Sequence, residues 1–143
     1  MTNLDRITIS QQIMLGFLAI HAPLASVKAL FLNWEVYEVY YSQGNNKEVF
    51  IEVCFESTGL VCLFDKDMLC ETVSIMPDNP ADISLYIEYC QATYPYYEQL
   101  ECWIINNFVI RKNIYKEAYC LSIEPLKKEE EQIISLKSVE KQA

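Results

Sequence analysis

The chain has 143 residues and a net charge of −9, so it has the length of one domain and is acidic overall. Its apolar content of 52%, which counts ten tyrosines, excludes a disordered chain and does not suggest a membrane protein. The negative charge argues against nucleic acid as a direct ligand, because affinity for phosphates comes from clustered Lys and Arg.

The first predicted elements are two short helices. Thr8 to Gln11 has the pattern of a capping box, in which each of the two side chains satisfies one free backbone N–H at the start of a helix. Apolar residues then recur at three- and four-residue spacing as far as His21, and Pro23 can begin a second helix. Residues 13–32 are mostly apolar, but the proline divides them into segments too short to span a membrane. The segment before it, Met1 to Gln12, carries one Asp and one Arg and so lacks the positive region that begins a signal peptide.

Residues 35–75 change to the two-residue period of β-strands. Four strands joined by turns are predicted here, and they form an antiparallel meander. In the second strand, the apolar residues from Val49 to Phe55 alternate with polar ones and are expected to face the core, so the residues between them face away. The outward face of the meander is therefore predicted to carry Glu38, Tyr40, Glu48, Phe50, Glu52 and Glu56.

For the second half of the chain, the sequence leaves more than one secondary structure open. Asn79-Pro80 has the pattern of a helix start, with an N-cap followed by proline. Residues 96–111 fit either a helix, which we favour, or a hairpin that turns at Asn106-Asn107. Residues 117–123 are expected to form a further strand, and residues 126–143 a polar helix or a frayed tail.

Six cysteines occur at wide spacings without any C-x₂-C pair, and His21 is the only histidine. Zinc sites in small domains use closely spaced ligand pairs, so no metal site is predicted. Most of the cysteines lie within apolar runs, where a thiol behaves as a small buried hydrophobe. We therefore expect buried free thiols and a reducing compartment, the cytoplasm.

The sequence contains no motif typical of an enzyme or of a nucleotide-binding loop. We predict no enzymatic activity and no cofactor. If an activity exists, it is expected to use a cysteine nucleophile with His21 as its base, since no other imidazole is available. For His21 we favour a capping or core position over this catalytic role.

The negative charge is concentrated in one block. Residues 35–105 contain thirteen acidic residues and only two basic ones, Lys47 and Lys66, whereas the blocks on either side each have a net charge of +1. Two interpretations remain open: a solvated sheet face, or an acidic surface that steers a basic partner. The abundant tyrosines either fill the core or supply contact area for a partner. If a partner binds, its predicted contact residues are Glu38, Tyr40, Phe50, Glu52 and Glu56, extended by Tyr96, Tyr97 and Trp103.

The predicted fold class is α+β: a single domain over residues 1–143, with N-terminal helices, a four-stranded antiparallel meander and C-terminal helices packed on the sheet. This order of elements is similar, at the level of the fold alone, to toxin-neutralising immunity proteins, to small inhibitors carried by mobile elements and to secretion chaperones. We predict a small acidic protein that binds and neutralises or inhibits a cognate protein partner with a basic surface. The alternatives are a dimeric chaperone that holds an effector segment, and an enzyme with an unrecognised Cys/His site. No nucleic-acid or membrane partner is expected, and a homodimer is left open.

Overall fold

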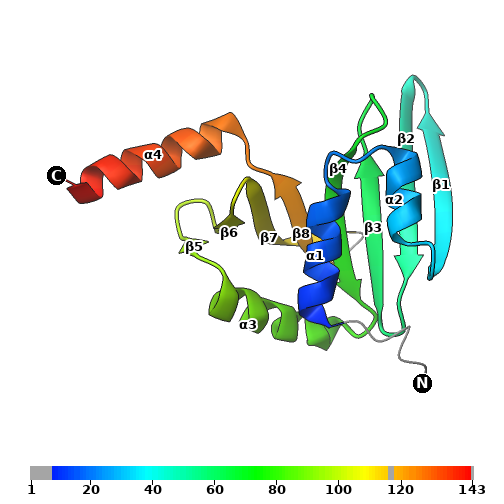
Figure 1. Ribbon diagram of the computed structural model, residues 1–143, viewed down its shortest axis with the longest axis horizontal. Coiled ribbons are helices and arrows are strands. Elements are labelled where there is room, and N and C mark those ends of the chain that lie inside the picture. Colours follow the sequence, from blue (N-terminus) through cyan, green and yellow to red (C-terminus); the bar gives the residue numbers. More distant parts are fainter. Residues whose placement is uncertain (1–7, 116–117, 143) are drawn as a thin grey trace.

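The fold was analysed in a computed structural model that describes residues 8–115 and 118–142. Its centre is one antiparallel sheet of eight strands in the order β1-β2-β3-β4-β8-β7-β6-β5 (Figure 1). The first half of the sheet contains β1 (Glu35–Gln43), β2 (Asn46–Cys54), β3 (Thr58–Phe64) and β4 (Cys70–Pro77). The second half contains β5 (Tyr96–Tyr97), β6 (Cys102–Ile105), β7 (Phe108–Tyr115) and β8 (Ala118–Pro125). The α+β class and the meander over residues 35–75 are thus confirmed, and β8 extends the sheet by pairing with β4.

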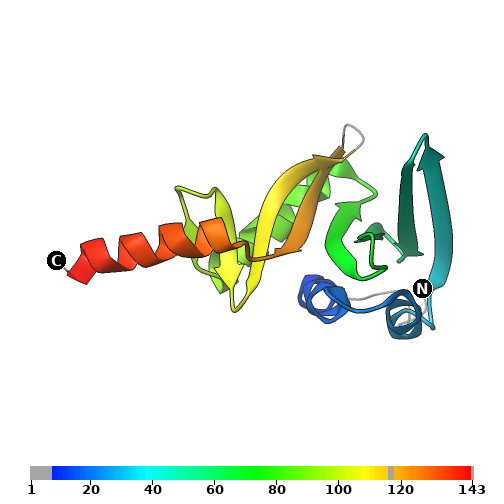
Figure 2. The same cartoon turned by 90° about the horizontal axis from the view of Figure 1, so that it is seen from above.

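Three helices pack on one face of this sheet: α1 (Ile9–Ala19), α2 (Leu24–Leu30) and α3 (Ile83–Thr93), the last preceded by a 3₁₀ turn, Pro80–Asp82. Figure 2 shows α1 and α2 side by side on that face. The fourth helix, α4 (Lys128–Gln142), starts against the opposite face at β6 and β7 and runs away from the sheet (Figure 1). Within the described residues, no helix is both long enough and apolar enough to cross a membrane.

The predicted local signals at the N-terminal helices are present. The Gln11 amide donates to the Thr8 hydroxyl at 3.1 Å and the Thr8 amide donates to the Gln11 side chain at 2.9 Å, which completes the capping box. Pro23, predicted as the first residue of the second helix, is instead the N-cap residue of α2, which begins at Leu24. His21 lies in the turn after α1 with a left-handed φ of 69° and an exposed side chain, so it occupies a helix end and not the core.

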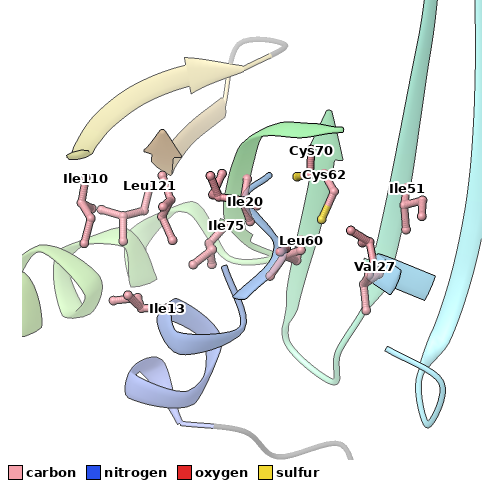
Figure 3. Packing of buried hydrophobic residues seen from close by; sticks show 14 of the residues in the cluster. Ile13, Ile20, Val27, Ile51, Leu60, Cys62, Cys70, Ile75, Ile110 and Leu121 are labelled. Atoms are coloured by element: carbon pink, nitrogen blue, oxygen red, sulfur yellow. The ribbon is translucent and has the colours of Figure 1, made fainter. Parts of the chain in front are cut away.

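The main core lies between the sheet and helices α1–α3 (Figure 3). As predicted from the alternation in β2, Ile51 and Val53 are fully buried and Phe55 is nearly so. Ile13 and Val27 reach the same core from α1 and α2. Burial of such side chains stabilises the fold by about 1.5–3 kcal/mol each.

The favoured helix over residues 96–111 is wrong, and the hairpin alternative is correct. Asn106 adopts a left-handed φ of 54°, which lets a two-residue turn bring Ile105 opposite Phe108. Asparagine tolerates this backbone conformation better than most residues. The short apolar runs on either side therefore pair as β6 and β7 instead of continuing as one helix.

All six cysteines are free, and five of them are buried; Cys54, at the end of β2, is exposed. The prediction of buried free thiols thus holds for all but Cys54. The thiols of Cys62 and Cys70 lie close together between β3 and β4 (Figure 3), and hydrogen bonding to Cys70, together with burial, raises the pKa of Cys62 far above its ordinary value. A thiol held in its neutral form in this way is a poor nucleophile.

A candidate partner-binding face

The register of β1 and β2 assigns the side chains of these strands to the two faces of the sheet. Glu38 lies opposite Ile51, whereas Tyr37 lies opposite Glu52 and Val39 opposite Phe50. Residues directly opposite each other in antiparallel strands point to the same side. Since Ile51 is in the helix-covered core, Tyr37, Val39, Phe50 and Glu52 must lie on the other side.

Helix α4 covers only the far half of this second face. Leu126 and Ile134 pack there against the cluster of Cys102, Ile104 and Val109. The start of α4 is also held by Glu130, whose carboxylate accepts a hydrogen bond from Arg111 at 2.8 Å and a second from the Lys127 amide at 3.1 Å.

The rest of the second face, over β1–β4 and β8, is not covered by any helix that the structure describes. We call this surface the open face. By the strand registers, it consists of Glu35, Tyr37, Val39, Tyr41, Glu48, Phe50, Glu52, Cys54, Val61, Leu63, Thr72, Ser74, Cys120 and Ser122.

The open face is hollowed at its middle. The β1–β2 and β7–β8 hairpins rise on either side of β3 and β4 (Figure 2), and between them lies a hollow of about 140 Å³. Its floor includes Val61 and Ser122, which are buried although no described helix covers them. Phe50, Leu63 and Ile114 contribute apolar walls. The hollow can accept an apolar side chain of a partner.

Carboxylates dominate the charge on the β1–β3 part of the open face. The outward positions of these strands hold Glu35, Glu48 and Glu52, and, among the side chains described there, neither Lys nor Arg. The Tyr37 hydroxyl donates to Glu35, which raises the pKa of Tyr37. Although Cys54 is exposed, partial desolvation raises the pKa of its thiol, and the nearby charges of Glu35 and Glu52 raise it further. This local negative potential would attract cations and basic side chains.

Of the sequence-predicted contact residues, Phe50 and Glu52 lie on the open face. Glu38 and Tyr40 do not, so the prediction that all of them share one outward face needs correction. Glu38 pairs with Lys28 of α2 on the helix-covered side, and it accepts a hydrogen bond from the Tyr40 hydroxyl at 2.7 Å. Hydrogen bonds from Lys28 and Tyr40 lower the pKa of Glu38. The wrong assignment has a geometric cause: the two-residue turn at Gly44-Asn45 pairs each even-numbered residue of β1 with an odd-numbered one of β2.

The other predicted contact residues lie elsewhere. Glu56 is exposed in the turn after β2, beyond the end of the strand. Tyr96, Tyr97 and Trp103 are at the opposite end of the sheet, on β5 and β6. Trp103 is only 4% exposed and donates from Nε1 to Gln91 of α3 at 3.2 Å, so it belongs to the core. These residues therefore do not form one surface with β2.

Sequence reasoning missed the tyrosines that do share the open face. Tyr37 and Tyr41 are 49% and 51% exposed, and they lie beside Glu52 and Glu48 respectively across the β1–β2 ladder. The signal was present in the sequence, because a two-residue turn at Gly44-Asn45 fixes which residues of the two strands are opposite.

No particular cysteine is predicted as the partner of His21, and the structure joins His21 to Cys70 through the backbone. The His21 amide donates to the Cys70 carbonyl at 2.7 Å, but the Cys70 thiol is buried and the His21 side chain is exposed. Among the described residues, no group of three or more His, Cys, Asp and Glu side chains is placed to hold a metal ion. Comparison with protein families, with curated proteins and with solved structures finds no match to this chain.

Proposed function

We propose that this chain is a small acidic, non-enzymatic protein that binds a cognate protein partner through the open face and thereby neutralises or inhibits it. The observation that carries the proposal is that half of one sheet face has no covering helix among the described residues, although it carries apolar and aromatic side chains. Exposed apolar patches with a charged rim are typical of interaction surfaces.

The chemistry of the open face favours a basic partner. Phe50 is flanked on its own strand by Glu48 and Glu52, two residues away on either side and therefore on the same face. An apolar contact at Phe50 and the neighbouring hollow would supply affinity, while the carboxylates would accelerate association and exclude acidic competitors. Occlusion of a basic functional surface on the partner would then be enough to inhibit it.

A secretion-type chaperone is the second candidate, supported by the hollow in the open face. An extended client segment could place side chains in it along the strand direction. The two candidates differ in what they recognise, because a chaperone binds its client segment unfolded whereas an inhibitor needs the folded partner. The two candidates are distinguished by measuring the affinity of the chain for the native partner and for the same partner in denatured form. For either candidate we propose the cytoplasm, where a reducing environment keeps buried thiols free.

The test is a matched pair of charge-reversal variants, each expressed with an affinity tag in the cell that produces the chain. Glu48→Lys/Glu52→Lys changes the open face, and Glu88→Lys/Glu98→Lys makes the same change in net charge at exposed sites on α3 and in the β5–β6 turn. We expect a protein that co-purifies with the wild type and with the Glu88→Lys/Glu98→Lys control but not with the open-face variant. Equal recovery with both variants, or no specific partner with the wild type, would contradict it.

A further inference from the structure

The two edges of the sheet differ sharply in how they are protected. The β5 edge is two residues long and follows Pro95, features that limit pairing with another chain. The β1 edge is nine residues long, and its register with β2 runs without a shift from Glu35 to Gln43. In both views β1 lies at the margin of the described structure, with no described element beyond it (Figures 1 and 2).

The β1 edge lacks most of the features that prevent an edge strand from pairing with a strand of another chain. It contains no proline, no lysine and no bulge, and it is rich in valine and tyrosine, which favour strands. Its charged residues are Glu35 and Glu38, and Glu38 already has its charge partner in Lys28. Because ladder hydrogen bonds alternate in an antiparallel pair, every second residue of β1 directs its N–H and C=O away from β2.

We infer that β1 pairs with β1 of a second copy, antiparallel and about a two-fold axis at Val39. Val39 is the midpoint of the strand, so this register is the one that uses all nine residues. It places Tyr37 opposite Tyr41 of the second copy, and aromatic cross-strand pairs stabilise sheets. It also places Glu38 opposite Tyr40, so that no two carboxylates of β1 face each other. A slip that centred the pair on Glu38 would oppose two glutamates.

The consequence for the molecule is a single sheet of sixteen strands, because each copy contributes eight. A two-fold axis perpendicular to the sheet keeps the two open faces on the same side. The acidic and aromatic surface would then be continuous across the dimer. This inference does not rest on the proposed function, since pairing through the edge leaves the open face accessible.

The two-fold axis makes Val39 a specific site to test, because it is the one side chain expected to face its own copy. Val39→Glu and Val39→Lys would each oppose two like charges at the axis, whereas a mixture of the two variants would oppose unlike charges. Val39→Thr is the matched control, since it keeps a β-branched residue of similar shape without a charge. Circular dichroism checks that each variant folds.

Sedimentation equilibrium of the wild type and of Val39→Thr is expected to give twice the chain mass of 16.7 kDa. Each charged variant alone is expected to sediment as a monomer, and their equimolar mixture as a dimer. A monomeric wild type at high micromolar concentration, or dimers of both charged variants alone, would overturn the inference.

Amide hydrogen exchange on the wild type gives a second measurement that needs no variant. Alternate amides of β1 are expected to be protected at high protein concentration and to exchange faster on dilution. Fast exchange of the outward amides at every concentration would also overturn the inference.

Discussion

We predict that the buried hydroxyl of Tyr86 stabilises the fold. This side chain is 5% exposed, and its hydroxyl donates to the side-chain oxygen Oε1 of Gln12 at 2.8 Å and lies 2.9 Å from the Thr58 hydroxyl. The contacts join α3 to α1 and β3. Tyr86→Phe would keep the packing of the ring while removing both contacts.

The loss of stability expected for Tyr86→Phe comes from the buried polar group that loses its contact with the Tyr86 hydroxyl. Thr58 is 4% exposed, so water has little access to its hydroxyl once the Tyr86 hydroxyl is removed. A buried polar group without a partner costs about 1–3 kcal/mol, which corresponds to a fall in melting temperature of about 3–9 °C for a domain of this size. Tyr96→Phe is the control, because Tyr96 is 43% exposed and a surface change of this kind stays within about 0.5 kcal/mol.

Urea unfolding followed by circular dichroism measures both variants. A double-mutant cycle with Thr58→Val assigns the effect to the contact itself, because coupled residues give non-additive losses. A loss below about 0.5 kcal/mol for Tyr86→Phe, or additive effects in the cycle, would refute the argument that this hydroxyl links the three elements.

Two further predictions concern the helix-covered face. A Cβ at Gly16 would lie 2.5 Å from Cδ1 of the fully buried Ile123. Gly16→Val is therefore expected to lower the free energy of unfolding in urea by about 1–3 kcal/mol, although valine has the better helix propensity. Unchanged stability would contradict the close approach of α1 to β8. Because Lys28 lowers the pKa of Glu38, their pairing stabilises the fold above the ordinary glutamate pKa and is lost as pH falls through the lowered value. Lys28→Met should raise the pKa of Glu38 in an NMR titration, with a small effect on stability because both groups are exposed; an unmoved pKa would show that the pair does not form in solution.

The meander could be predicted because its signals are local. Alternation between Val49 and Phe55 identifies the buried side of β2, and short turns follow each strand. The pairing of β4 with β8 could not be predicted in the same way. It joins Val73 to Ile123 across fifty residues of chain, and no local pattern specifies which distant strand completes a sheet edge.

The hairpin of β6 and β7 shows a second kind of difficulty. The apolar runs here, residues 102–105 and 108–110, fit a strand and one side of a helix equally well, so periodicity alone does not distinguish the two. The deciding feature is the left-handed backbone at Asn106, which a sequence permits but does not require.

The candidate face was predicted for β2 but not for β1. The side of each β2 residue followed from its own alternation, and Phe50 and Glu52 were placed correctly. The residues of β1 needed the register across the turn at Gly44-Asn45, which decides that Tyr37 and not Glu38 accompanies Glu52. A slip of one residue in register moves every side chain to the other face, so this single turn determines the composition of the proposed surface.

Site-specific photo-crosslinking in the cell that produces the chain shows directly which surface the partner contacts. A photoreactive amino acid at Tyr41 reports on the open face, and one at Leu85, which is 51% exposed on α3, reports on the helix-covered side. We predict a discrete cross-link to a heterologous protein at position 41 that weakens as salt screens the carboxylates, and none to that protein at position 85. Equal cross-linking at both positions, or cross-linking at position 85 alone, would contradict the assignment of the open face as the partner-binding surface.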